Sequence, residues 1–455
     1  MKTQTQASRA DMLLNQPVKR VIPRLAIPTI ISMLITSIYN MADTFFVSQI
    51  STAASGAVGV TFSAMALIQA LAFTIGMGCS TNMSRALGRG DTEEARRFVS
   101  LAFFTALGVG MVISVLGVSL IGPIVRFLGA TETIAPYAQA YATYIFLAAP
   151  FIMCSFAMNN LFRLQGLATY GMVGMASGGI LNMLLDPILI FGLGLGISGA
   201  AIATAISQVV SFVILLVMTN IREDTIHIRF RDYRPTASLY GRMLSNGFPS
   251  LGRQGIASIS TIVLNNVAGA WGDPAIAAMS IVTRYTMFIN ASVIGFGQGF
   301  QPVCAFCYGA GRYSRVREAY RFSVKVVTVI LVVLAGVSLL FARPIVTVFR
   351  PEDQDVIRIG TLALQLQLAA MPLWGLTVIS SMFTQAIGDG LRSTIISIAR
   401  QGIFLIPALL ILPPLYELLG LQMAQPLSDV FSFGLSLVLS EQLLKQMKKL
   451  PEPQR

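Results

Sequence analysis

The chain has 455 residues, of which 55% are hydrophobic and only 11% are charged, and its mean hydropathy is +0.72. Soluble domains carry about 25% charged residues, so this composition excludes an ordinary soluble globular protein. The formal net charge of +12 raises the question of nucleic acid. We expect no nucleic-acid partner, because the basic side chains are distributed as a membrane topology requires.

Apolar runs of about 20 or more residues recur along the whole chain, which is typical of a helical protein that crosses a membrane many times. We therefore expect an all-α polytopic membrane protein with twelve spans. In chain order these lie near 22–48, 55–84, 98–121, 135–162, 169–192, 196–219, 240–270, 275–307, 319–341, 355–386, 393–414 and 419–443. The polar first twenty residues lack the apolar core of a cleavable signal peptide, so we expect the first span to be retained.

Lys and Arg residues are sorted by side of the membrane. Of the 32, the N-terminus, the even-numbered connections and the C-terminus hold 25, when residues at the edge of a span are counted with the connection they adjoin. The odd-numbered connections hold four, and three lie within spans: Arg253, Arg284 and Arg400. The positive-inside rule then places both termini in the cytoplasm, and we expect a multi-pass protein of the bacterial inner membrane.

The two halves of the chain resemble each other at a shift of 221 residues. Glycines match at this shift, among them Gly76 with Gly297, Gly78 with Gly299, Gly88 with Gly309, and Gly90 with Gly311. The shift contains six spans, and an even number of spans returns the chain to the same side, so the halves are parallel repeats. We expect an N-terminal six-helix lobe in 1–221, a cytoplasmic linker in 222–239 and a C-terminal six-helix lobe in 240–455. Two such lobes that rock against each other give a transporter with alternating access.

Few carboxylates lie deep in the expected spans. They are Asp43, Asp186 and Asp429, with Glu441 near the end of the last span. A charged side chain at the bilayer centre costs about 2.5–3.5 kcal/mol on insertion scales, so such a residue normally faces the interior or a water-filled cavity and serves a function.

Asp43 and Asp186 both lie a few residues before the outer ends of their spans, so they share one depth in the N-terminal lobe. Asn182 is one helical turn before Asp186, and Thr204 lies about two turns into the next span from the outside. Pro187 removes one helical hydrogen bond and leaves a backbone carbonyl free nearby. This all-oxygen set suits a hard monovalent cation, and two close carboxylates also suit a proton, so sodium and proton both stay open.

The C-terminal half lacks this set, because Leu264 and Gln425 stand where Asp43 and Thr204 stand in the first half. Asp429 and Arg400 remain there, and they either pair with each other or line the cleft between the lobes. The stretch TRYTMFIN mixes polar and aromatic groups within a span. With Asp429, it supplies our candidates for a substrate cleft: Arg284, Tyr285, Met287, Phe288 and Asn290. Cys304 and Cys307 share a helix face without further metal ligands, so we expect them to be packing residues.

Four segments, in order and at suitable spacing, resemble one known family. They are NMADTFFVSQ, LNMLLDPILIFGLGLGISGAAIAT, GFGQGFQPVCAFCYGAGR and AQPLSD. The chain resembles the multidrug and toxic compound extrusion (MATE) family over essentially its whole length, and within it the DinF-like branch.

The resemblance implies twelve helices in two pseudo-symmetric six-helix bundles arranged as a V. It implies export of amphipathic, often cationic organic compounds, driven by the entry of sodium or protons. It carries a cation site over onto Asp43, Asn182, Asp186 and Thr204, with a backbone contribution near Ala200. Other branches carry acids in the seventh and tenth helices, which this chain lacks within the membrane, and this argues against a second cation site.

The favoured hypothesis is therefore a cation-coupled multidrug antiporter of the cytoplasmic membrane, which confers antibiotic resistance. We expect it to be a monomer whose partners are small organic molecules and membrane lipids, and to need no cofactor beyond H⁺ or Na⁺. An alternative is a related exporter or flippase of a lipid-linked or metabolic substrate. A third hypothesis, an intramembrane aspartyl hydrolase, would need catalysis by Asp43 and Asp186, and we expect no enzyme.

Overall fold

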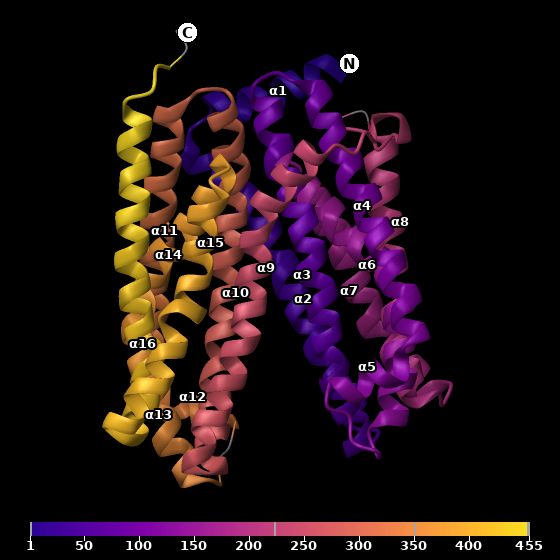
Figure 1. Cartoon of the computed structure of the whole chain (residues 1–455), viewed down its shortest axis with the longest axis vertical. Helices are drawn as coiled ribbons and strands as arrows, with labels where there is room; N and C mark the ends of the chain where they lie inside the picture. Colours follow the sequence, from indigo (N-terminus) through magenta and orange to yellow (C-terminus); the bar gives the residue numbers. More distant parts are fainter. Residues whose placement is uncertain (1, 223, 350–351, 453–455) are drawn as a thin grey trace.

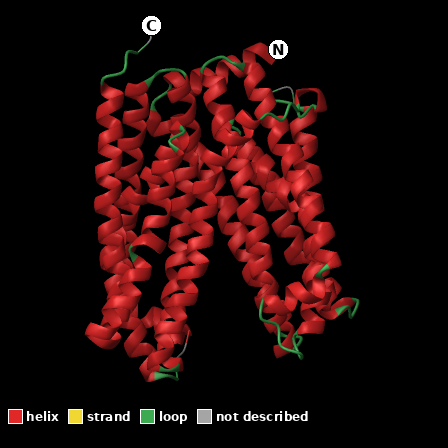
Figure 2. Ribbon diagram, viewed as in Figure 1, coloured by secondary structure: helices red, strands yellow, loops and turns green. Residues whose placement is uncertain are grey.

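The computed structural model describes residues 2–222, 224–349 and 352–452, and within these ranges every regular element is a helix (Figure 2). The first half of the chain supplies nine elements. They are α1 (Lys2–Asn15), α2 (Val18–Ser48), α3 (Thr52–Gly88), α4 (Thr92–Ser119), α5 (Ile121–Phe127), α6 (Ala135–Leu164), α7 (Ala168–Pro187), the π-helix η1 (Ile188–Gly192) and α8 (Gly196–Ile221).

The second half begins with the short 3₁₀ turn η2 (Phe230–Asp232). Its other elements are α9 (Ala237–Ala268), η3 (Gly269–Trp271), α10 (Asp273–Gly309), α11 (Tyr313–Leu340), α12 (Ala342–Phe349), α13 (Gln354–Ala370), η4 (Met371–Leu373), α14 (Trp374–Ile387), α15 (Gly390–Ile398), the π-helix η5 (Ala399–Ile403) and α16 (Leu405–Lys448). We propose that residues 222–239 form the linker between the two lobes.

Ten helical segments of the described chain are long and apolar enough to cross a membrane. The segment Gly390–Lys448 counts once among them, but its 59 residues are enough for two crossings, and the backbone leaves helical geometry at Tyr416 and Glu417. The helix α9 is not among the ten, because polar residues such as Arg242 and Arg253 lower its hydropathy, yet it is 32 residues long and runs within the bundle. Together these segments account for the twelve predicted spans.

The molecule has the shape of a V (Figures 1 and 2). The bundle that runs from indigo to magenta in Figure 1 is the first half of the chain, and the bundle in pink, orange and yellow is the second half. The two bundles meet at the end where both termini lie and diverge toward the opposite end. The predicted fold, two six-helix bundles in a V, is confirmed.

Glycines close the contact between the lobes at the joined end. A side-chain carbon added at Gly88 of α3 would overlap the carbonyl oxygen of Phe306 in α10, and one added at Gly309 would overlap that of Arg85 in α3. Each of these two contacts is the other shifted by 221 residues, so they are related by the repeat of the chain. Glycine allows two helix backbones to approach this closely, which explains why the repeat preserves it here.

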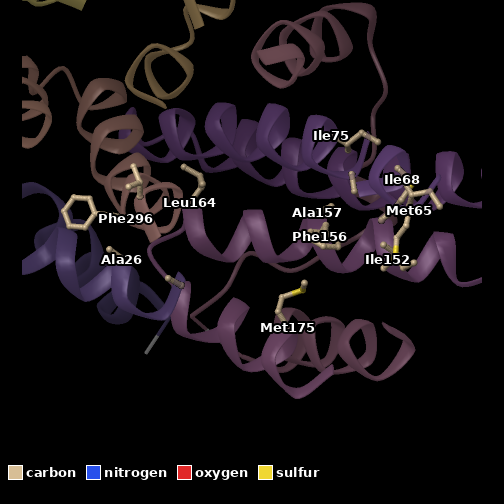
Figure 3. Packing of buried hydrophobic residues seen from close by; sticks show 14 of the residues in the cluster. Ala26, Met65, Ile68, Ile75, Ile152, Phe156, Ala157, Leu164, Met175 and Phe296 are labelled. Atoms are coloured by element: carbon tan, nitrogen blue, oxygen red, sulfur yellow. The ribbon is translucent and has the colours of Figure 1, made fainter. Parts of the chain in front are cut away.

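Side chains of α3 and α6 form much of the core of the N-terminal lobe. Figure 3 shows Met65 and Ile68 of α3 beside Ile152 of α6. Ala26 of α2 and Phe296 of α10 are labelled in the same view. Both are buried, and they lie on the two helices whose contact joins the lobes. α2 therefore belongs to the N-terminal core and to the interface at the same time.

Candidate functional site

Small residues of α7 bring three helices of the N-terminal lobe together. A side-chain carbon at Gly178 would lie 2.8 Å from the carbonyl oxygen of Ser207 in α8, and one at Gly179 would lie 3.1 Å from the ring of Tyr39 in α2. One turn earlier, the Ser211 hydroxyl of α8 donates a hydrogen bond of 2.7 Å to the carbonyl of Gly174. α7 is thus held against α8 on one side and against α2 on the other, one to two helical turns before Asn182 of the predicted cation site.

Asn182, Asp186 and Thr204 form one hydrogen-bonded group between α7 and α8. The Asn182 amide nitrogen donates to Oδ1 of Asp186 at 3.3 Å and to the Thr204 hydroxyl oxygen at 3.2 Å. All three side chains are buried, and Asp186 is 0% exposed. Ala200 is also fully buried, one turn before Thr204 on α8.

Asp43 of α2 lies next to this group. Its Oδ2 accepts a hydrogen bond of 3.0 Å from the hydroxyl of Tyr141 in α6, and the residue is only 8% exposed. Asp186 is near enough for the negative charges of the two carboxylates to act on each other. The structure therefore brings together the four side chains that depth and helical spacing group in the sequence.

Three buried oxygens of the site receive no hydrogen bond from any described residue. They are Oδ1 of Asp43, Oδ2 of Asp186 and Oδ1 of Asn182. Among the ion pairs of the described chain, none involves Asp43 or Asp186. Buried carboxylates that have no basic partner and a donor to only one of their two oxygens are costly, and a proton or a small cation bound at the free oxygens would relieve that cost.

A second feature of the structure is a cavity of about 280 Å³ within the C-terminal lobe. Of the residues that the sequence nominated for a substrate cleft, Met287 and Asn290 line this cavity. Arg284 and Phe288 are exposed and do not line it, and the Tyr285 hydroxyl instead lies 2.5 Å from the Ser338 hydroxyl.

Asp429 is buried behind the cavity and is saturated with donors. Its Oδ1 accepts from Nε of Arg400 at 2.6 Å and from Gln425 at 3.2 Å, and its Oδ2 accepts from Gln367 and from Nε1 of Trp374, each at 2.7 Å. The Arg400 guanidinium also lies over the Trp374 ring, 4.0 Å from its centroid. Of the two alternatives for Asp429 and Arg400, the structure favours the pair, and Arg400 alone of the two also lines the cavity.

Sequence reasoning missed two residues. Tyr141 enters its span from the outer end and so reaches the depth of Asp43, which was a signal that the sequence did offer. Arg163 was counted with a surface connection, but it is 2% exposed and donates hydrogen bonds of 2.5 Å to Gln298 of the other lobe and to Asn160. The contact between the lobes covers it, and the sequence of one helix carries no sign of that contact.

Comparison with known proteins identifies the family. The family model MatE matches residues 28–188 and 249–410, and the starts of the two matches lie 221 residues apart, as the internal repeat requires. The chain belongs to the MATE family. Members of this family are transporters and not enzymes, so the hydrolase hypothesis is wrong.

MATE transporters resemble this chain over nearly its full length. The multidrug export protein MepA of Staphylococcus haemolyticus (strain JCSC1435) is 27% identical over 396 residues, which cover 87% of each chain. A solved transporter of the MOP superfamily from Pyrococcus furiosus is 27% identical with a TM-score of 0.91, over 97% of this chain and 99% of that one. A multidrug resistance MATE transporter of the MOP superfamily in an outward-facing conformation gives the same identity, TM-score and coverage.

Gly178→Ala is expected to destabilise this MATE transporter by about 1–3 kcal/mol, because the added carbon would press on the carbonyl of Ser207 and push α8 from α7. The thermal unfolding midpoint in detergent should fall. Gly192→Ala is the matched control, since an added carbon there meets no atom within 4 Å and alanine favours a helix. An unchanged midpoint for Gly178→Ala would mean that α7 and α8 can separate without cost.

Proposed function

We propose that this MATE transporter is a cation-coupled antiporter that exports amphipathic, often cationic organic compounds across the cytoplasmic membrane by alternating access. One observation carries the proposal. The carboxylates of Asp43 and Asp186 are both buried on the packed helices α2 and α7, and each keeps one oxygen that no described residue satisfies. A bound proton or sodium ion would stabilise such a pair of carboxylates more than the side chains around it do.

The substrate class is supported by the relatives. MepA is described as a multidrug export protein, and the outward-facing neighbour is described as a multidrug resistance transporter. The exposed apolar groups Met287 and Phe288 of α10 suit amphipathic compounds of varied shape.

The distribution of Lys and Arg indicates toward which side of the membrane the two lobes open. The positive-inside rule assigns both termini to the cytoplasm, and the lobes meet at that end of the molecule (Figure 2). The diverging ends then face the outside, in agreement with the likeness to a transporter solved in an outward-facing conformation.

α2 provides a physical link between the ion and the lobes. It carries Asp43 at one end, and at the other end Ala26 packs against Gly299 of α10 so closely that an added carbon on the glycine would overlap it. Pro28 lies between these points and removes one helical hydrogen bond, which makes bending there easier. An ion that neutralises Asp43 and Asp186 changes how α2 sits against α7 and so biases the equilibrium between the two arrangements of the lobes.

The test is transport in proteoliposomes under separate gradients. Purified protein is reconstituted with ethidium, the membrane potential is held at zero with valinomycin and equal potassium, and a sodium or a pH gradient is imposed alone. We expect one of the two gradients to drive dye movement, and Asp43→Asn to abolish that dependence. Dye movement that ignores both gradients would reject coupling, and dye that never moves would reject the substrate class.

A further inference from the structure

The cavity in the C-terminal lobe has a basic lining. Arg253 of α9 and Arg400 of η5 both contribute to its wall, and no Asp or Glu is found among the described residues that line it. The two acids of the proposed cation site lie in the other lobe. The lining of this cavity therefore differs in the sign of its charge from the proposed cation site.

The positive charge at this cavity is only partly balanced. The Asp429 carboxylate binds Nε of Arg400, and no hydrogen bond of the two terminal guanidinium nitrogens is found within the described chain. Arg253 takes part in no hydrogen bond or ion pair with any described residue. A cationic ligand in this cavity would meet net repulsion, which is strong where water is scarce.

The rest of the lining suits an amphipathic molecule. Apolar contact is available from Leu264 and Met279, Trp374 also forms part of the wall, and Thr283 and Asn290 offer polar groups. The side-chain oxygen of Asn290 is buried and accepts no hydrogen bond from the described residues. At about 280 Å³ the cavity lies near the lower end of the range for small-molecule sites, which begins at roughly 300 Å³. It fits a compact ligand with a single aromatic ring.

We infer that this cavity binds small aromatic organic anions, with a carboxylate or sulfonate group in the field of Arg253 and Arg400 and the ring against Trp374. The inference rests on the proposed export function and adds to it a substrate class of opposite charge. An arginine without a carboxylate partner offers up to five donors, and a planar anionic group is the ligand that matches them best. The cation site in the N-terminal lobe stays free for the coupling ion.

The chain supplies a built-in reporter for this site. It contains two tryptophans, Trp271 and Trp374, and only Trp374 lines the cavity. In the variant Trp271→Phe, quenching of fluorescence excited at 295 nm therefore reports occupancy at Trp374. The probes are 4-nitrobenzenesulfonate and 4-nitrobenzylammonium, two quenchers with the same ring and opposite charge. The protein is held in nanodiscs of phosphatidylcholine, and calorimetric titration of the unchanged chain provides a second measurement of each Kd.

We expect saturable quenching by the sulfonate with a Kd at least about tenfold lower than that of the ammonium probe. Arg253→Gln should raise the Kd of the sulfonate about tenfold, and Arg253→Lys, which keeps the charge, should raise it much less. Equal or tighter binding of the ammonium probe would overturn the inference. So would a sulfonate Kd that Arg253→Gln leaves unchanged.

Two further measurements distinguish this inference from the proposed export function and from binding of a lipid headgroup. Asp43→Asn should lose ion-coupled dye transport and still bind the sulfonate, because Asp43 lies in the other lobe. Dye export with normal coupling but no sulfonate binding would reject the anion site alone. Loss of sulfonate binding when half of the nanodisc lipid is replaced by phosphatidylglycerol, at constant ionic strength, would assign the cavity to a lipid headgroup and overturn the inference.

Discussion

Asp43→Asn is expected to abolish ion-coupled export while the protein still folds and reaches the membrane. The amide of asparagine keeps an oxygen that can accept the hydrogen bond from Tyr141, so the contact between α2 and α6 survives. The negative charge is lost, however, and with it the group that attracts a cation or takes up a proton. We expect the export rate to fall at least about tenfold, which corresponds to about 1.4 kcal/mol of activation free energy. The measurement is drug resistance in cells together with gradient-driven dye efflux in proteoliposomes.

The matched control is Asp355→Asn, the same chemical change at an exposed aspartate. Asp355 lies in the first turn of α13, where its pair with Arg358 is open to solvent, so its replacement should leave export unchanged. Asp186→Asn should behave like Asp43→Asn, because both carboxylates share one site. Normal coupling in both site variants would remove the cation site from the N-terminal lobe.

The fold could be predicted from the sequence because a membrane imposes simple rules on it. Apolar runs gave the spans, and matched glycines gave the repeat, which the paired contacts of Gly88 and Gly309 then display in space. The helix α1 was not predicted. Its position depends on partners far along the chain. The carbonyl of Leu13 accepts a hydrogen bond of 2.7 Å from Nε of Arg315, and Arg9 forms an ion pair of 3.2 Å with Asp224. The π-helices η1 and η5 likewise depend on local packing that no periodicity records.

The part of the candidate site that could be predicted is the part that follows from the energetic cost of a charge in the membrane and from the depth of each residue in its span. Asp43 and Asp186 stood out because a carboxylate in an apolar span is expensive, depth supplied Thr204 as a neighbour, and helical spacing supplied Asn182. The properties of the C-terminal cavity could not be predicted in the same way. Whether Arg253 has a partner is decided by side-chain contacts between helices, and one sequence does not contain those distances. The same limit left the arrangement of Asp429 open between a pair and a cleft position.

That arrangement leads to the second large expected effect, since Asp429→Asn should destabilise the protein by about 3–5 kcal/mol. The change removes the counter-charge of Arg400, whose side chain is only 14% exposed, and the new amide must present a donor to groups that are themselves donors. The thermal unfolding midpoint in detergent and denaturation in mixed micelles measure the loss. Lys445→Met, which breaks the solvent-exposed pair of Lys445 with Glu441, serves as the control and should change stability little.

A double-mutant cycle decides whether the pair is what matters. Arg400→Met alone leaves the Asp429 carboxylate buried without its cation, so it should also destabilise strongly. The double variant removes both charges, and its loss should fall below the sum of the single losses by about 2 kcal/mol or more. Strict additivity would mean that the two residues act independently. Export lost in Asp429→Asn at unchanged stability would instead make Asp429 a transport residue of the C-terminal lobe, because a purely structural carboxylate cannot lower transport without first lowering stability.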